Sequence, residues 1–503
     1  MPMELDVLIP ENDSVRLISQ FVEEMDLTAL YDTYERMPSE KYASPEIMLK
    51  VMLYAYHEAK DISSRSIEKN CRRDIDYKYL LEGRAAPDHA AIARFRTKHF
   101  AKCAQSFLAQ MSRILYELDQ LTTSEVFIDG TKIEAAANKY TFVWKRAVSR
   151  HQARFLRKTA LLVGDIIQRY DLKPLWQKQV RKKHVKKLLK TLKTLARKQG
   201  LEFVCGRGHR KEQLQRDIED LEAALEKIRE YELKIHNCGM RNSYSKTDND
   251  ATFMHMKDDH MMNGQLKPAF NVQHAVDSGF IVSVGIFPDP TDVLTLKPFV
   301  ENMESNLNMK FERIVADAGY ESEENLTYLK EIGRKENMMY DAEHDCYICC
   351  NGKAVKKTGS RKVKTASGYI REETHYYCEE CDGCPHRAKC LEGKNWKKPL
   401  DKRYKTLIVS RKFEALRAEE YRLIDSEEGK KLRMNRSIQA EGCFADIKGD
   451  CGFTRFLCRG SVNVQAEYIL FAMSHNPGWL HSRIQNDKLN LHLYELKQEK
   501  EAA

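Results

Sequence analysis

The sequence predicts a mixed α/β core that is interrupted by two insertions and preceded by an all-helical region. Two short apolar runs, Val126–Ile128 and Ile314–Ala316, each end at an aspartate, as strands that lead to a site often do. A strongly basic stretch follows the first run, and a cysteine-rich stretch follows the second. With 503 residues, 42% of them hydrophobic, the chain is long enough for several domains with cores of their own.

The N-terminal region, residues 1–120, is predicted to be helical because apolar residues such as Leu49, Met52 and Leu53 recur at helical spacing. Asp88 suits the N-cap of a short basic helix over 89–99. That helix is similar to the second helix of a helix-turn-helix, in which Arg94 and Arg96 would contact DNA. A plain helical bundle with a solvated basic face explains the same pattern, so both interpretations stay open.

The core is predicted in two parts, residues 121–144 and 241–334. The first part holds a strand at 125–137 that carries Asp129. In the second part, alternating segments on both sides of Ser278-Gly279 predict a hairpin. The further elements expected there are a helix near 292–306, the strand that ends at Asp317, and a helix near 323–333.

The resulting order, βββαβα, is that of the front half of a ribonuclease-H-like fold. In that fold the first and fourth strands lie side by side, so their ends would bring Asp129 and Asp317 together. This step depends on knowledge of the fold, since spacing alone does not establish it.

Residues 145–240 are predicted to form an inserted basic helical hairpin. Between Lys145 and Lys198 there are eighteen Lys or Arg residues and two acids. The densest part includes Lys182, Lys183, Lys186 and Lys187. We favour contact with the DNA phosphate backbone, because the charge is so one-sided; the alternative is a solvated charged face.

A cysteine-rich insertion is predicted over residues 335–430, where a Cys-x2-Cys-x2-Cys-x5-Cys run is preceded by three further cysteines, Cys346, Cys349 and Cys350. Cys-x2-Cys pairs on a hairpin are typical of structural zinc sites, which fold around their metal. The candidate ligands are Cys349, Cys381, Cys384 and Cys390, with Cys378 as the strongest spare. The run is also similar to iron–sulfur spacing, and unliganded buried thiols are a third interpretation.

A third acid, Glu441, lies in a predicted helical part of the core at 431–480, which a tail at 481–503 follows. Two strand-end carboxylates and one helical carboxylate are what a two-metal phosphoryl-transfer site needs, and Mg²⁺ or Mn²⁺ prefers such oxygens. On a helix Lys448 would lie two turns from Glu441, on the same side. Glu467 is a competitor for the third carboxylate.

Several motifs together resemble insertion-sequence transposases of the DDE type. They lie at Pro45–Tyr56, Arg65–Ile75, Pro87–Arg96, Phe127–Ala135, Ala316–Tyr320 and Gly452–Gly460. The resemblance implies a helical N-terminal transposase domain and a ribonuclease-H-like catalytic domain. It implies that Asp129, Asp317 and Glu441 bind the metals, and that Arg436 and Lys448 contact DNA phosphate.

The expected activity is therefore Mg²⁺-dependent cleavage at element ends and strand transfer into double-stranded target DNA, by a homodimer on paired ends. Two other functions stay open: a non-catalytic DNA-binding protein derived from a transposase, and a resolvase-like nuclease on the same fold. The chain departs from the family in two places. Arg436 precedes Glu441 by five positions where relatives have four, and Pro477-Gly478 interrupts a segment that is usually helical.

Composition bears on the compartment. The net charge of +9 permits a nucleic-acid partner. No run of eighteen apolar residues is present, so no transmembrane helix is expected. The first residues lack the basic-then-apolar pattern of a signal peptide, and we expect a cytoplasmic bacterial protein that acts at the nucleoid. Its fourteen cysteines should then be thiols or metal ligands.

Overall fold

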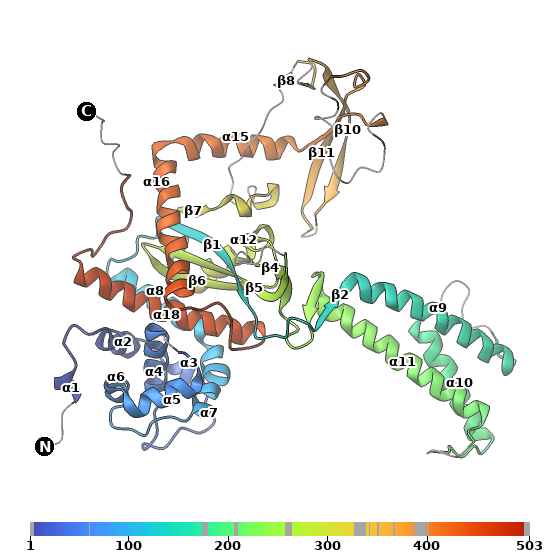
Figure 1. The fold of residues 1–503 in the computed structure, drawn as a ribbon, viewed down its shortest axis with the longest axis horizontal. Helices are drawn as coiled ribbons and strands as arrows, with labels where there is room; N and C mark the ends of the chain where they lie inside the picture. Colours follow the sequence, from blue (N-terminus) through green and yellow to red (C-terminus); the bar gives the residue numbers. More distant parts are fainter. Residues whose placement is uncertain are drawn as a thin grey trace.

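The computed structural model describes residues 5–496, except 60, 174–179, 206–209, 257–263, 326–338, 342, 350–351, 366–367, 386, 388–398 and 400–401. A mixed sheet lies at the centre, with the N-terminal helices packed beneath it in the view of Figure 1. A helical arm projects to one side, and a second, smaller sheet lies above. The chain therefore has a mixed α/β fold with a helical N-terminal region, as the sequence predicts.

The described part of the N-terminal region consists of helices joined by turns and loops, with no strand. Its main helices are α2 (Ser14–Glu23), α4 (Pro45–Glu58), α5 (Ser64–Arg73), α6 (Ile75–Leu80), α7 (His89–Arg94) and α8 (Ala104–Glu117). Asp88 caps α7 as expected, since its Oδ1 accepts the N–H of Ala91 at 2.6 Å. Helix α4 is buried along most of its length because it packs between α2 and the long C-terminal helix α18 (Ser461–Gln485). The N-terminal helices therefore share one hydrophobic core with the central sheet.

The central sheet contains β1 (Glu125–Glu134), β4 (Thr252–His255), β5 (Leu266–Asp277), β6 (Phe280–Phe287) and β7 (Arg313–Ala316). Strand β1 pairs antiparallel with β5 and parallel with β7. The other edge of β5 pairs with β4 and β6. The β5–β6 hairpin turns at Ser278 and Gly279, which have φ of +54° and +82°, as a two-residue turn with positive φ at both positions requires. The structure confirms the predicted hairpin. It also confirms that the predicted first and fourth strands are neighbours.

Helices line the sheet and carry the third acid. Helix α12 (Leu296–Leu307) follows the 3₁₀ turn η3 (Asp292–Leu294), close to the predicted 292–306. The helix expected near 323–333 falls mostly outside the described residues. Helix α15 (Arg411–Asp425) leads to one continuous helical rod. The rod consists of α16 (Glu427–Arg436), the π-helical η6 (Ser437–Glu441), α17 (Gly442–Ala445) and the π-helical η7 (Asp446–Asp450).

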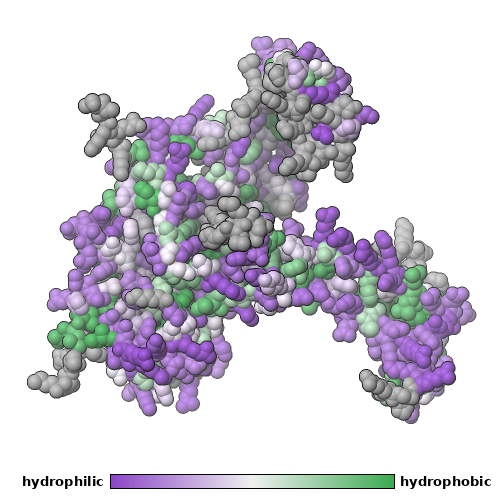
Figure 2. All heavy atoms as spheres, in the orientation of Figure 1, coloured by the Kyte–Doolittle hydropathy of each residue, from purple (hydrophilic) through white to green (hydrophobic). Residues whose placement is uncertain are grey.

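The basic segment, residues 145–240, has three described helices where the sequence predicts two. They are α9 (Lys145–Arg169), α10 (Lys182–Lys198) and α11 (Gln213–Cys238). Helix α9 ends at Arg169, two residues before Asp171, which takes a φ of +47°. Both α9 and α10 pack on α11. Strands β2 (Phe142–Trp144) and β3 (Ser243–Ser245) pair at the base of this arm. A separate apolar cluster holds the arm together. Figure 2 shows that the outer surface of the arm is mainly hydrophilic.

The cysteine-rich segment forms an antiparallel sheet. Its strands are β8 (Met339–Asp341), β9 (Cys346–Ile348), β10 (Ala354–Lys364), β11 (Ile370–Tyr377) and β12 (Thr406–Val409), in the spatial order β12-β11-β10-β9-β8. Three aromatic residues, Tyr340, Tyr347 and Tyr376, pack within this small sheet. Across the described residues of the whole chain, no helix is long and apolar enough to cross a membrane.

Candidate active site

Asp129 and Asp317 lie at the same end of two neighbouring strands. The parallel register of β1 and β7 pairs Ile128 with Ala316, and each aspartate is the next residue. The Asp129 side chain is 9% exposed, and Asp317 is half-buried. Asp317 is fixed by its own turn, because its Oδ1 accepts the N–H of Gly319 at 2.8 Å. Two of the three predicted carboxylates therefore come from adjacent strands, as the strand order requires.

Close packing behind the aspartates requires glycine at position 130. A Cβ there would lie 2.3 Å from Nε2 of Gln273 and 2.9 Å from Oδ1 of Asp292. Neither group can move freely, since Gln273 and Asp292 are hydrogen-bonded to each other at 3.0 Å. Gly130 is thus required by the packing of the sheet, next to the candidate site residue Asp129.

Asp292, which the sequence ranks below Glu467 as a candidate for the third carboxylate, joins this acidic group. Its Oδ1 accepts hydrogen bonds from Asn271 Nδ2 at 2.8 Å and from Gln273 Nε2 at 3.0 Å. The hydroxyl of Tyr320 donates to Gln273 Oε1. Burial raises the pKa of Tyr320, and the negative charges of Asp292, Asp129 and Asp317 raise that pKa further. These side chains come from three separate elements, so their contact is seen only in the folded chain.

Glu441 is connected to Asp129 through Arg436. Arg436 Nη2 donates to Glu441 Oε1 at 2.6 Å, while its Nη1 lies 3.6 Å from Asp129 Oδ1. Ser437 Oγ also donates to Glu441, at 2.9 Å from Oε2. The π-helical turn at Ser437–Glu441 explains how Arg436 reaches an acid five positions away, because each π-helical hydrogen bond spans five residues. The unusual spacing therefore still produces an ion pair.

The inner face of the rod supports Glu441. Phe444 and Ile447 are buried, and the Phe444 ring stacks on His274 with centroids 3.6 Å apart. His274 Nε2 donates to the carbonyl of Ala440 at 3.0 Å. Burial lowers the pKa of His274 to about 3, so the imidazole is neutral and structural. Lys448 is half-buried on η7.

The donor set matches a hard divalent cation in kind, since it consists of carboxylates. Its arrangement does not match: among the described residues, no group of three or more His, Cys, Asp or Glu side chains is placed to hold a metal ion. Arg436 instead lies between Asp129 and Glu441.

The predicted cysteine ligands lie partly within the described chain. Cys349 and Cys378 follow strands β9 and β11, and Cys381 is buried nearby. Cys381 Sγ accepts the N–H of Lys405 at 3.4 Å. Burial raises the pKa of Cys378 to about 11, and its neighbours Cys381 and Cys349 contribute to that shift. Cys384 is half-buried, and Cys390 falls outside the described residues.

The predicted DNA contacts differ in their placement. Arg94 is exposed, but Arg96 is 6% exposed and donates to the hydroxyl of Tyr56 at 3.1 Å. The expectation that Arg96 contacts DNA is therefore wrong, because its guanidinium is enclosed where α4 and α18 meet. Glu467, the competitor for the third carboxylate, is fully buried and instead accepts the backbone N–H groups of Leu457 and Cys458.

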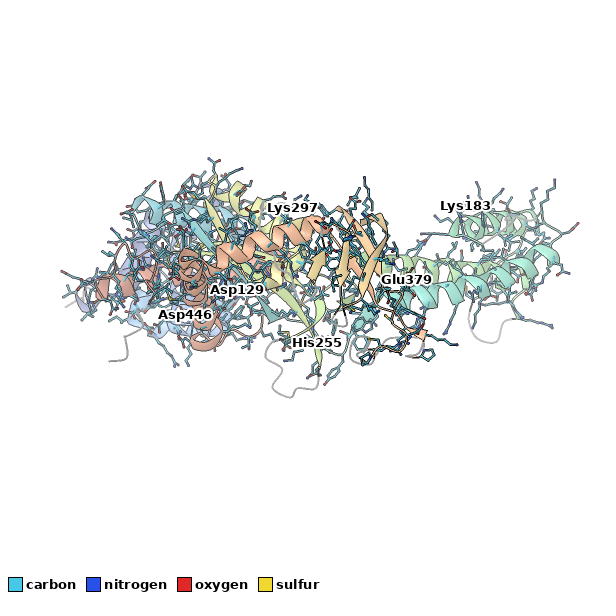
Figure 3. All side chains as sticks on the ribbon, turned by 90° about the horizontal axis from the view of Figure 1, so that it is seen from above. Asp129, Lys183, His255, Lys297, Glu379 and Asp446 are labelled. Atoms are coloured by element: carbon cyan, nitrogen blue, oxygen red, sulfur yellow. The ribbon has the colours of Figure 1, made fainter. Side chains whose placement is uncertain are left out.

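On the arm, Lys183, Lys186 and Lys187 are exposed, whereas Lys182 is paired with Glu232 of α11. Figure 3 shows Lys183 on the arm, well separated from Asp129 in the core. The arm and the acidic group are thus distinct parts of the surface.

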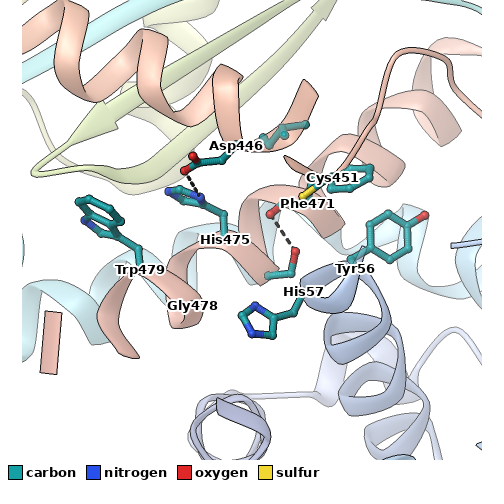
Figure 4. Close-up of a pocket in the computed structure, with 10 residues that line it drawn as sticks. Tyr56, His57, Asp446, Cys451, Phe471, His475, Gly478 and Trp479 are labelled. Carbon is teal, nitrogen blue, oxygen red and sulfur yellow. Dashed lines mark hydrogen bonds and ion pairs between the residues drawn. The ribbon is translucent and has the colours of Figure 1, made fainter. Parts of the chain in front are cut away.

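A cavity of about 210 Å³ lies between α4, η7 and α18, lined by residues that include His57, Asp446 and His475 (Figure 4). His475 Nδ1 is 3.6 Å from Asp446, and its Nε2 is 3.5 Å from the buried Cys443 Sγ and 3.0 Å from the carbonyl of Gly279. Burial raises the pKa of the Cys443 thiol far above its usual range, so it is not a nucleophile. The cavity lies where the N-terminal helices meet the core, and its walls carry both polar and apolar side chains.

Two family models match the chain. A transposase DDE domain matches residues 348–481, a range that includes Arg436 and Glu441 but neither Asp129 nor Asp317. A transposase domain (DUF772) matches residues 3–98, which cover most of the N-terminal helices. No curated protein and no solved structure matches the chain. The two transposase matches indicate that the chain is an insertion-sequence transposase of the DDE type.

Proposed function

We propose that this chain cuts DNA at the ends of its element and joins the freed 3′-hydroxyls to target DNA. The proposed active site consists of Asp129, Asp317 and Glu441. The proposed metal is Mg²⁺ or Mn²⁺, bound as two ions. The observation that carries the proposal is the linkage of all three acids. Two of them follow paired residues of parallel strands, and the third is tied to Asp129 through Arg436.

The strand order supports a ribonuclease-H-like assignment for the core. Strands β1, β5 and β6 are followed by α12 and then β7, and β7 lies parallel to β1. We assign this core to residues 121–144, 241–334 and 431–480. The arm (145–240) and the cysteine-rich sheet (335–430) are then insertions, residues 1–120 form the N-terminal domain, and 481–503 form the tail.

Metal ions bound to such carboxylates would supply Lewis-acid stabilisation of the attacking and leaving oxygens. In the present arrangement Arg436 lies between two of the acids, so a metal ion could bind both only after Arg436 has moved. What the chain itself contributes is the position of its charges. Arg436 and Lys448 lie on the Glu441 rod, where each could donate charge-assisted hydrogen bonds to a DNA phosphate.

The arm is the proposed second DNA contact. Lys183, Lys186 and Lys187 are exposed on α10, where they can neutralise backbone phosphates and release counterions. We also propose that Arg94 contacts DNA, and that two copies of the chain act on paired element ends.

The alternative function is non-catalytic DNA binding by a former transposase. The substitution Asp317→Asn separates the two functions, since it removes a charge but keeps an acceptor for the Gly319 N–H. We expect strand cleavage to fall by about 10² or more, while DNA binding in a gel-shift assay is unchanged. Equal cleavage by this variant and the natural chain would refute the assignment of Asp317. A resolvase-like nuclease would instead cleave without preference for the element's ends.

We further propose that the cysteine-rich sheet binds one structural Zn²⁺ through four of Cys349, Cys378, Cys381, Cys384 and Cys390. The support is the Cys-x2-Cys spacing and the contact between two of these residues, since Cys381 Sγ donates to the carbonyl of Cys378 at 3.7 Å. Metal analysis of the purified chain tests this directly. One zinc per chain that is lost in Cys381→Ser is the expected result, and a zinc-free, folded chain would contradict the proposal.

A further inference from the structure

Arg436 stands where the proposed metal site would need its cation. It contacts Glu441 Oε1 at 2.6 Å and lies 3.6 Å from Asp129 Oδ1. We propose that Arg436 is an internal counter-cation that blocks metal loading in the DNA-free chain, and that a DNA phosphate draws it away from the acids. This inference depends on the proposed function, because it takes Asp129 and Glu441 as metal ligands.

The first support is that the bond to Asp129 is incomplete. Arg436 Nη1 is buried and has no hydrogen-bond partner within the described structure. Its 3.6 Å separation from Asp129 Oδ1 exceeds the range of an N–H···O hydrogen bond. A buried donor without an acceptor is costly, so this nitrogen is available to an incoming oxygen. The guanidinium is therefore held near the acids by charge, with one donor unused.

The second support is that the bond to Glu441 is easily exchanged. The Glu441 side chain is 50% exposed, whereas that of Arg436 is 13% exposed. An ion pair with a half-exposed acid contributes little net stability, because water solvates the acid when the pair opens. A guanidinium fork also matches a phosphate as well as it matches a carboxylate. A DNA phosphate can thus replace Glu441 as the partner of Arg436 at small cost.

The consequence is a coupling between DNA and metal. While Arg436 neutralises Asp129 and Glu441, a divalent cation must displace it to bind. Once a phosphate holds Arg436, both carboxylates regain their full negative charge and attract the cation. By linkage, DNA then raises the affinity for metal by the same factor as metal raises the affinity for DNA.

The test is Mn²⁺ binding to the full chain, measured by the electron paramagnetic resonance signal of free Mn²⁺, with and without duplex DNA from the element's ends. For the natural chain we expect DNA to tighten Mn²⁺ binding by about 5-fold or more. Arg436→Gln should bind Mn²⁺ more tightly than the natural chain without DNA, and DNA should add nothing further. Arg433→Gln, an exposed arginine one turn earlier in α16, is the matched control and should behave like the natural chain.

Equal Mn²⁺ affinity of Arg436→Gln and the natural chain without DNA would overturn the inference. Asp129→Asn and Glu441→Gln separate this failure from that of the proposed function. If these two variants lose Mn²⁺ binding while the Mn²⁺ affinity of Arg436→Gln is unchanged, only the counter-cation role of Arg436 is refuted. If the two variants bind Mn²⁺ normally, the assignment of Asp129 and Glu441 as metal ligands is refuted. Should Arg436→Gln not fold, Arg436→Met removes the charge and keeps a long side chain for packing. Its Mn²⁺ affinity without DNA should exceed that of the natural chain, and no increase would again overturn the inference.

Discussion

Arg436 donates a hydrogen bond of 2.6 Å to Glu441 from five positions earlier in the same helical rod. In an α-helix the facing positions are three and four residues apart. Here a π-helical turn over Ser437–Glu441 lengthens the local repeat, so position five faces the acid. Related transposases have a four-residue spacing at this place. In this chain the π-helical turn compensates for the extra residue.

Replacing Asp292 with alanine should destabilise the core. The amides of Asn271 and Gln273 would lose their shared acceptor, and a buried unsatisfied donor costs about 1–3 kcal/mol. Asp292→Asn should cost less, because its side-chain oxygen can still accept both bonds. Urea unfolding measures the difference. Asp289→Ala is the control, since Asp289 makes no hydrogen bond among the described residues, and an equal loss in both alanine variants would refute this role.

His274 should make folding sensitive to acid. Burial lowers its pKa from 6.5 to about 3, so the unfolded chain binds the proton more readily than the folded chain. The stability from the neutral imidazole is therefore complete above pH 6.5 and is lost as the pH falls toward 3. Between pH 7 and pH 4, the stability measured by thermal unfolding should decline more steeply for the natural chain than for His274→Gln. This range spans about three pH units, each worth up to about 1.4 kcal/mol. Parallel curves would contradict this account.

The arm should set part of the salt dependence of DNA binding. Replacing Lys183, Lys186 and Lys187 with glutamine should reduce the slope of log K against log[salt] by up to about 2.7, because each phosphate that a lysine neutralises contributes about 0.9 to that slope. The control is the triple glutamine variant at Lys211, Lys227 and Lys234, which pair with Glu219 and Glu230 on α11. An unchanged slope in the first variant would exclude the arm from the DNA interface.

Elements with strong local patterns could be predicted from the sequence. The alternation around Ser278-Gly279 predicts the β5–β6 hairpin, and the two apolar runs that end at Asp129 and Asp317 predict β1 and β7. These patterns are local because strand alternation and turn residues act over a few positions.

Features that depend on distant partners could not be predicted in this way. Arg96 lies in a basic segment that suggests a surface, yet α18, more than 350 residues later, contributes to its burial. Asp292 joins the acidic group only through its bonds to β5. Pro477 suggests a helix break, but α18 continues through it while its neighbour Asn476 bonds to Ile281 of β6.

The central claim is that Asp129 belongs to a metal-dependent DNA-cleaving site. The most direct measurement is cleavage and joining of DNA that carries the element's own ends, with Mg²⁺ or Mn²⁺, by the natural chain and by Asp129→Ala. We predict metal-dependent cleaved and joined products that Asp129→Ala fails to make, although it still binds the DNA. Metal-independent products, or equal products from Asp129→Ala, would contradict the claim.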